Sequence, residues 1–408
     1  MLGLALLSVI ASASPLTLEQ AWQHARTNSP RLRAAVADVA VADAAAVVAG
    51  RWLLDPTLQV AASSDALTTG KGELDLDAQL QQSLRWPMET WALRTSAEAL
   101  VDAAGDERRR AEVVAWRELA VAYGTLAAAV DELALRQSLL QIAQRTNDAA
   151  IARANTGASA PIEASFAAVD VAAANSAVLQ TQASVGAARA GLCRELGDVS
   201  CPDVAVVWPT VSVPVLSDEA LLTTIEARPD VEAARTRVVA AQAQRDAASW
   251  QRVPAPTLGV TATLQRAEFN AVIDEDTLLG LRLSAPLPVF SLGQGNVAGA
   301  DAQHARRQAE RDALRLRALH ETRAALQVWQ ASVRARATWQ QVEPRFEESL
   351  RWLSEGYAAG AISLDTLLSG RDRIVRAQLE SIAVHRAELT AAADVLLALG
   401  HLPAGASP

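Results

Sequence analysis

Polar and apolar residues alternate along residues 73–86, ELDLDAQLQQSLRW. Successive side chains of a β-strand point to opposite faces, so a period of two predicts a strand with one apolar and one polar face. The same alternation occurs in three other segments: 58–63, 257–264 and 279–285. The pattern therefore predicts four two-faced strands, arranged along the chain as two pairs.

The segments that follow each strand pair predict long helices. Residues 88–154 contain no proline, and one continuous helix of that length would measure about 100 Å. Apolar residues recur every seven positions in three segments: Leu119, Leu126, Leu133 and Leu140; Val171, Val178, Val185 and Leu192; and Leu368, Val375, Ile382, Leu389 and Leu396. Such a sustained period predicts coiled-coil packing. Pro344 predicts a kink in a helix over 296–358.

The sequence is duplicated. Residues 28–63 resemble residues 227–263, and ANTGASAPIEA at 154–164 resembles YAAGAISLDTL at 357–367, each at a spacing of about 200 residues. Each half is predicted to contain a short helix, a helix of about 25 residues after a proline (30–54 and 229–252), two strands and a helical hairpin. The predicted organisation is listed in chain order: a signal peptide at 1–13, a first repeat at 14–199, a linker at 200–215, a second repeat at 216–400 and a tail at 401–408.

The N-terminus and the two cysteines suggest export from the cytoplasm. A short apolar run precedes Ala11-Ser12-Ala13, a small-x-small cleavage pattern, although a buried helical turn is an alternative. Cys193 and Cys201 flank a short loop, where an exported protein could form a disulfide. The alternatives are two unpaired cysteines or, less favoured, a metal pair.

Composition excludes several classes of function. The net charge is −9 without a basic block, which argues against a nucleic-acid partner. The five histidines are scattered and only two methionines occur, so no metal-ligand spacing is present. No phosphate-binding loop and no catalytic constellation stands out, so we expect neither an enzyme nor a cofactor.

The strands could belong to a soluble sheet or could span a membrane. Segments of nine to eleven residues suit tilted transmembrane strands, and no segment after the N-terminus is expected to span a bilayer as a helix. Four tryptophans lie where helix meets strand and suit an interfacial belt, although each could be an ordinary packing residue: Trp52, Trp86, Trp91 and Trp250. Four strands cannot close a barrel, so several chains would have to pool them.

This order of elements, with the motifs ARPDVEAAR, APLPVFSLGQG and YAAGAISLDTLL, resembles the TolC family of outer-membrane efflux proteins. The resemblance implies a mainly α fold with transmembrane β-strands. It also implies a homotrimer whose 12-stranded β-barrel in outer-membrane lipid continues into a periplasmic α-helical barrel. Family members give substrates a passive exit duct from a periplasmic adaptor and an inner-membrane pump, here expected to be of the resistance-nodulation-division (RND) type. In its modest length, the chain is most similar to the heavy-metal and cation-efflux branch of the family.

The resemblance also implies roles for individual residues. The hairpin tips would dock the adaptor, through Gly157, Pro161, Gly360 and Ser363. The slots that often hold acidic gate residues fall at Thr366 and Ser369, with Asp365 and Asp372 beside them, so Asp365, Ser369 and Asp372 are candidates for a periplasmic gate. Asp365 could instead simply favour a helix N-terminus. The water-facing side of the second strand would carry Asp75, Asp77, Gln79 and Gln81.

Two alternatives remain beside the efflux duct. A non-conducting helical bundle could bridge the layers of the envelope, and a soluble periplasmic adaptor would also contain a coiled-coil hairpin. Two hairpins at equal spacing, each preceded by two amphipathic strands, disfavour the adaptor. The sequence does not identify the exported substrate.

Overall fold

A computed structural model describes residues 16–64, 74–199, 205–269, 272–287 and 292–403. The predicted signal peptide, Cys201 and part of the predicted linker and tail lie outside these residues. The elements follow one another in this order: α1 (Leu18–Asn28), α2 (Pro30–Ala49), β1 (Thr57–Ser64), β2 (Leu74–Ser83), α3 (Pro87–Asn155), α4 (Pro161–Leu196), α5 (Asp218–Glu226), α6 (Pro229–Trp250), β3 (Thr257–Phe269), β4 (Val272–Ser284), α7 (Gln294–Gln340), α8 (Pro344–Ala358) and α9 (Leu364–Leu399).

The chain forms two compact units, and each takes elements from both sequence repeats. The sheet unit comprises Val36–Glu107 and Pro229–Arg315, which hold all four strands, α6 and the adjoining parts of α2, α3 and α7. The helical unit comprises the rest of the described chain, including α4, α8 and α9. The boundaries of the two sequence repeats stay a prediction.

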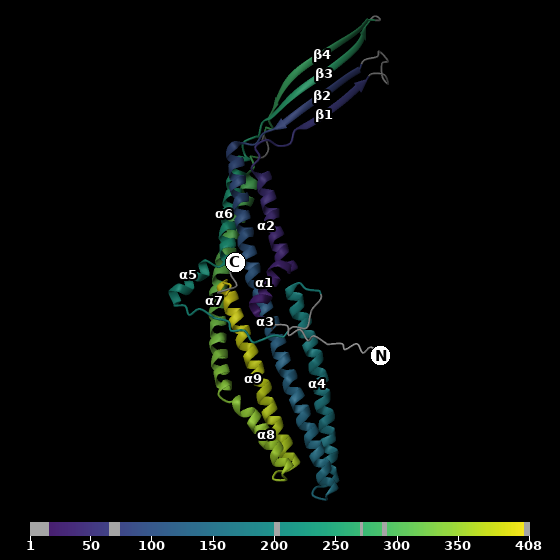
Figure 1. Ribbon diagram of the computed structural model, residues 1–408. Coiled ribbons are helices and arrows are strands. Elements are labelled where there is room, and N and C mark those ends of the chain that lie inside the picture. Colours follow the sequence, from purple (N-terminus) through teal and green to yellow (C-terminus); the bar gives the residue numbers. More distant parts are fainter. Residues whose placement is uncertain (1–15, 65–73, 200–204, 270–271, 288–291, 404–408) are drawn as a thin grey trace, which may run out of the picture. The chain divides into compact units, whose positions relative to one another are not determined.

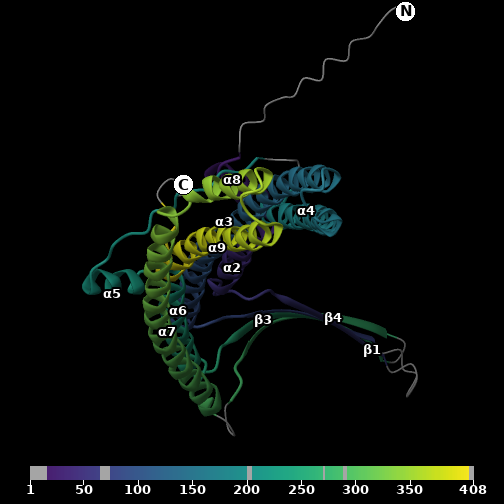
Figure 2. The ribbon, with the colours of Figure 1, turned by 90° about the horizontal axis from the view of Figure 1, so that it is seen from below.

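The sheet is antiparallel in the order β1-β2-β3-β4, so the strand pairs of the two repeats meet at its centre (Figure 1). The register keeps the two-residue pattern in phase from strand to strand, because Gln59 pairs with Gln79 and Gln79 with Thr261. Most polar positions therefore share one face and most leucine and valine positions the other. Exceptions include Leu278, which pairs with Thr263 on the polar face, and Gln82 and Thr277, which pair with Leu258 and Leu264 on the apolar face. Figure 2 shows that the sheet is curved.

The helical unit is built on two hairpins whose ends carry the expected capping residues. α3 runs without a break for 69 residues. Pro161 opens α4, where the missing N–H of proline costs nothing, and Gly197 ends it with φ +71°. Ser363 caps α9 by accepting a hydrogen bond from the N–H of Thr366.

A core of buried side chains holds α1, the start of α2, α3, α4 and α9 together within the helical unit. Trp116 is 2% exposed and Tyr123 is fully buried. The Tyr123 hydroxyl lies 2.7 Å from the carbonyl of Leu16 and 2.9 Å from that of Val207, so its one proton has an acceptor at either. Many predicted heptad positions are buried. Leu119, Leu126, Val185, Leu192 and Leu396 belong to this core, and Val178, Val375 and Leu389 are buried elsewhere.

Three expectations about helices need correction. The helix predicted over 30–54 ends at Ala49, because Gly50 disfavours helix and Pro56 favours an extended chain before it. The kink expected at Pro344 is a complete break, in which α7 ends at Gln340 and α8 starts at Pro344. Two helices, α3 and α4, are long and apolar enough to pass as membrane spans, contrary to expectation, but alanine-rich coiled-coil helices pass this test as well.

Candidate functional site: sheet faces and hairpin tips

The polar face of the sheet carries three separate pairs of side chains within hydrogen-bond distance, which together involve three strands. Thr263 in β3 donates to the carboxylate of Asp77 in β2 at 2.6 Å. Arg282 in β4 donates to the amide oxygen of Gln79 at 3.1 Å, and the hydroxyls of Ser83 and Thr257 lie 3.2 Å apart. The register also places Asp75 and Gln81 on this face. It is a surface suited to water.

The opposite face of the sheet is apolar and exposed along its length. Leu281 is 91% exposed and Leu279 is 79% exposed, although both belong to a regular strand. The other exposed apolar residues of this face are Leu58, Val60, Leu74, Leu76, Leu80, Leu258, Val260, Leu264 and Leu283. A monomeric soluble protein rarely leaves such a continuous apolar surface in water, so this face needs an apolar environment.

The sheet also has two unpaired edges. Among the described strands, β1 pairs only with β2 and β4 pairs only with β3. Each outer edge therefore presents a row of backbone N–H and C=O groups to which another strand could bond. In hydrocarbon such groups must be paired, because an unmade backbone hydrogen bond there costs several kcal/mol.

The four predicted interface tryptophans lie in the sheet unit near the junctions of helix and strand. Trp86 follows β2, and its indole N–H donates to the carbonyls of Val253 (3.1 Å) and Pro254 (3.2 Å) just before β3. The remaining three, Trp52, Trp91 and Trp250, are exposed. An exposed ring at such a junction is compatible with a membrane interface, and the role stays a prediction.

The two hairpin tips are built alike and touch within the helical unit. Gly157 and Gly360 both adopt φ +75°, which only glycine tolerates readily, and each ends the first arm of its hairpin. The Arg153 guanidinium donates to the carbonyl of Tyr357 at 2.9 Å and lies 5.0 Å from the centre of its ring. Burial raises the pKa of Tyr357, and the charge of Glu163 raises it further. Pro161 and Ser363 begin the second arms at these tips.

The three gate candidates are exposed, and among the described contacts nothing joins them to one another. Asp365 lies in the first turn of α9, as its helix-terminus interpretation predicts, and Ser369 donates to the carbonyl of Thr366 at 3.2 Å. Asp372 lies 4.0 Å from Arg371. Any ring that these residues form would need other copies of the chain.

Sequence reasoning missed the ion pair that lies beside them. Arg371 in α9 contacts both carboxylate oxygens of Asp170 in α4 at 2.5 Å, and the two side chains are only 11% and 16% exposed. The hydrogen bonds to Asp170 raise the pKa of Arg371 and keep it charged. A signal was available, because Arg371 stands three residues after Leu368 and four before Val375, at a core position of the heptad.

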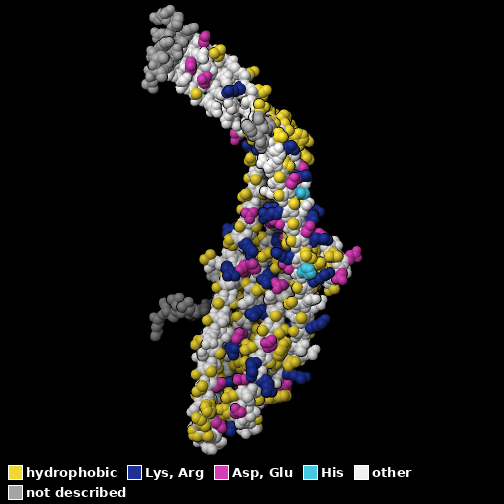
Figure 3. Space-filling view, turned by 180° about the vertical axis from the view of Figure 1, so that it is seen from behind, with side chains coloured by type: hydrophobic (Ala, Val, Ile, Leu, Met, Phe, Trp, Pro, Cys, Tyr) yellow, Lys and Arg dark blue, Asp and Glu magenta, His cyan; other side chains and the backbone are white. Residues whose placement is uncertain are grey.

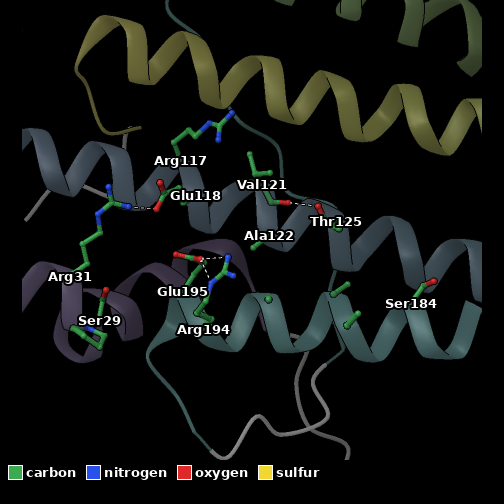
Figure 4. Close-up of a pocket in the computed structure, with 14 residues that line it drawn as sticks. Ser29, Arg31, Arg117, Glu118, Val121, Ala122, Thr125, Ser184, Arg194 and Glu195 are labelled. Atoms are coloured by element: carbon green, nitrogen blue, oxygen red, sulfur yellow. Dashed lines mark hydrogen bonds and ion pairs between the residues drawn. The ribbon is translucent and has the colours of Figure 1, made fainter.

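A cavity of about 970 Å³ lies between the start of α2, the middle of α3 and the end of α4 (Figure 4). Its charged side chains are paired, Arg31 with Glu118 and Arg194 with Glu195. Its α4 wall also includes three small apolar residues, Ala187, Ala188 and Gly191. Paired charges and small residues suit the packing of another helix better than the binding of a small molecule.

Charged side chains of both signs are interspersed over the helices in Figure 3, and Arg–Glu and Arg–Asp pairs are frequent among them. Among the residues that the structure describes, no group of three His, Cys, Asp or Glu side chains could hold a metal ion. The pairing of Cys193 with Cys201 stays a prediction, since Cys201 is outside the described residues. Among the described residues, the candidate functional surfaces are therefore the two faces of the sheet and the hairpin tips, and none of them is a metal centre.

Comparison with known proteins gives these faces a context. A family model described as "Outer membrane efflux protein" matches residues 21–198 and 221–401. The chain is a member of the outer membrane efflux protein family. This outer membrane efflux protein is similar to the pyoverdine export outer membrane protein OpmQ of Pseudomonas putida, with 28% identity over 417 residues, 96% of this chain and 87% of the relative.

Two solved structures share its fold. CusC superimposes with a TM-score of 0.78 at 17% identity, covering 94% of this chain and 92% of that chain. The outer membrane protein VceC of Vibrio cholerae gives a TM-score of 0.74 at 20% identity, covering 94% and 96%. This outer membrane efflux protein therefore provides an exit duct in the outer membrane that extends into the periplasm, as the resemblance predicted. The family is one of transport ducts and not of enzymes.

Proposed function

We propose that three copies of this outer membrane efflux protein form the duct, each supplying four strands to a 12-stranded barrel and its helical hairpins to a periplasmic tube. The single observation that carries the proposal is the sheet itself, which has one polar face, one exposed apolar face and two unpaired edges within one chain. Pairing β4 of one copy with β1 of the next removes every edge.

The helices support the same assembly. α2 has 20 residues and buries only Leu32, and α7 has 47 residues and buries only Ala318 and Thr322 among those described. Exposed valines at four positions of α2 need a partner: Val36, Val41, Val47 and Val48. Helices that bury so little of themselves gain their stability from packing against other chains. The alanine-lined cavity on α4 could accept part of such a contact.

The chemistry of the faces supports roles for the predicted site residues. Asp75, Asp77, Gln79 and Gln81 would line water, and the leucines of the other face would meet lipid, with Trp52, Trp86, Trp91 and Trp250 at the interface. Such a barrel gives an ion or small molecule a polar path. Nothing in this path requires that a bond be made or broken.

The hairpin tips would form the periplasmic end of the duct. Gly157, Pro161, Gly360 and Ser363 would dock a periplasmic adaptor, and an inner-membrane pump of the RND type would supply substrate through it. Asp365, Ser369 and Asp372 are proposed to line the mouth, where three copies of an exposed carboxylate would favour cations. The Arg371–Asp170 pair supports this placement, because it holds α9 to α4 beside those residues.

The substrate class has two candidates. The heavy-metal and cation-efflux branch was expected from the modest length, and the relative OpmQ is named for export of pyoverdine. A passive duct with a polar wall would pass either a metal ion or a soluble iron chelator, so the pump would determine the choice. Deleting the chain in its own host and measuring the accumulation of each class would separate them.

Engineered cysteines test the copy number and the edge pairing together. Ala61 in β1 and Gly280 in β4 lie on the polar face of the two edges, so a cysteine pair there, or at 61 with 278 or 282, should link neighbouring copies. Oxidation should give a ladder that ends at three chains. The matched control is a cysteine pair at Ala78 and Ala262, which lie opposite each other within one chain and should add no ladder.

Two results would contradict the proposal. A monomer that conducts ions in planar bilayers would show that a single chain is sufficient to form the duct. Trimers that never open in planar bilayers would favour the non-conducting envelope protein instead.

A further inference from the structure

One contact between the linker and the helices involves two stacked aromatic rings. The indole ring of Trp208 stacks on the imidazole of His385 in α9, with ring centroids 3.9 Å apart and an angle of 18° between the planes. The indole N–H donates to the carboxylate of Asp131 in α3 at 2.7 Å. Trp208 therefore contacts α3 and α9 at once, and one of its two partners is a histidine.

His385 belongs to a polar seam that continues to the break between α7 and α8. Ser381, His385 and Glu388 lie on successive turns of α9 and share one face. Ser381 donates to the carboxylate of Glu343, which also pairs with Arg336, a side chain only 12% exposed. Glu343 lies in the break itself, between Gln340 and Pro344. The same seam thus holds the linker and the α7–α8 break.

The charged groups that act on His385 come from each of these elements. Burial lowers the pKa of His385, and Arg336 lowers it further, while Asp131 and Glu343 act in the opposite direction. The net shift is downward, so the stacked histidine holds its proton less well than a released one. A released histidine has an ordinary pKa of about 6.5, so it binds more protons than the stacked one as the pH falls below that value. Acidification therefore favours release.

We propose that the Trp208–His385 stack is a proton-operated clasp that holds the linker to α3 and α9 near neutral pH and releases it in an acidic periplasm. The histidine is the only group of the stack that titrates, and Trp208 is the linker residue that it holds.

A second anchor, one residue away, limits how far the release can extend. The Tyr123 hydroxyl accepts from the N–H of Val207 at 3.0 Å and donates to its carbonyl at 2.9 Å. Burial raises the pKa of Tyr123 still further from neutrality, so this anchor is unchanged between pH 5 and pH 8. Residues 208–212 would move while Val207 stays, and these residues form one wall of a cavity of about 330 Å³ over Trp116.

The quenching of Trp208 fluorescence by a soluble quencher, acrylamide, tests the clasp on the purified full chain. Because the chain contains ten tryptophans, the Trp208 signal is the difference between the wild type and Trp208→Phe. The wild type should show a rise in quenching between pH 7.5 and pH 5.5. His385→Gln should show the same quenching at both pH values. Tyr123→Phe should increase quenching at both pH values and keep the pH-dependent step.

Hydrogen exchange in residues 207–212 of the wild type gives a readout that needs no variant to fold. After correction for the intrinsic pH dependence of hydrogen exchange, the backbone amides that follow Val207, up to residue 212, should exchange faster at pH 5.5 than at pH 7.5. The amide of Val207 should not. An unchanged Trp208 signal in the wild type, or an equal pH step in His385→Gln, would overturn the clasp. Neither measurement depends on conductance or on a trimer, so a failed clasp leaves the proposed duct untouched.

Discussion

The helical core and the sheet solve the problem of apolar surface in opposite ways. Around Trp116 and Tyr123, five helices of one chain close over large side chains, and the buried hydroxyl finds a backbone acceptor in Leu16. In the sheet, Leu279 and Leu281 stand in regular strands and remain exposed. The core is complete within one chain, whereas the sheet leaves its two edges unpaired and its apolar face exposed within that chain. In the proposed duct, other copies of the chain would pair the edges and lipid would cover the apolar face.

Trp116→Ala should have the largest effect and should act only on the core. Truncating a buried tryptophan costs about 3–5 kcal/mol, from lost burial and the cavity left behind. Urea unfolding followed by circular dichroism should show this loss in the helical transition. The matched control is Leu281→Ala, which removes an exposed side chain and should leave that transition in place. Equal destabilisation by the two variants would contradict the distinction between the regions.

Leu281→Arg should act on the sheet in the membrane and nowhere else. An arginine on the lipid face of a transmembrane strand costs about 2–4 kcal/mol near the bilayer midplane and less toward its edges. The fraction of heat-modifiable protein in outer-membrane fractions should fall accordingly. Gln79→Arg places the same charge on the polar face, beside Arg282, and should still insert. Equal insertion of both variants would contradict the assignment of the faces.

The Arg371–Asp170 pair sharpens the comparison, because it is a polar contact completed inside the helical unit. Its two side chains are nearly buried, so Arg371→Ala leaves a carboxylate without its partner. A double-mutant cycle with Asp170→Ala in urea unfolding should give a coupling energy of about 0.5–3 kcal/mol. The pair Arg94 and Glu98 is exposed and should couple by only a few tenths of a kcal/mol. Equal coupling energies in the two cycles would show that the buried pair stabilises the helical unit no more than the exposed pair does.

Acid should weaken the helical unit slightly through Glu343. Burial acts to raise the pKa of Glu343, but the hydrogen bonds from Arg336 and Ser381 and the charges of Arg336 and His385 outweigh it, so the pKa is lowered. A lowered carboxyl pKa gives stability that is present above the unfolded value and is lost as the pH falls through the folded value. The helical melting temperature should therefore drop below about pH 4.5, and Glu343→Gln should flatten this drop. A wild-type slope that persists in Glu343→Gln would assign it to other carboxylates.

The sequence predicted those features that depend on local pattern. Alternation placed Asp77 and Gln79 on one face, and the missing prolines of α3 predicted its length. Contacts between the two repeats could not be predicted in the same way. Arg371 lies 201 residues from Asp170, and Arg153 lies 204 residues from Tyr357, so no local period records either pair.

The two repeats also show how one residue changes a shared plan. α3 is continuous, and its counterpart in the second repeat is divided by Pro344 into α7 and α8. Proline alone predicts a kink, because it removes one helical hydrogen bond. At the interruption Glu343 keeps a helical φ of −46°, and its N–H still donates to the carbonyl of Trp339, while its carboxylate accepts a hydrogen bond from Ser381 in α9. That partner belongs to another element and could not be identified from the local sequence.

The most direct test of the account is to ask which solvent each face of the sheet meets. Single cysteines at Gln79 and at Leu281 lie on opposite faces of the same sheet and can be challenged with a water-soluble maleimide in intact outer membranes, in a background where Cys193 and Cys201 are serine. The account predicts that Gln79→Cys is labelled and that Leu281→Cys is labelled only after the membrane is dissolved in detergent. Equal labelling of both cysteines in intact membranes would show that both faces meet water and would contradict the account.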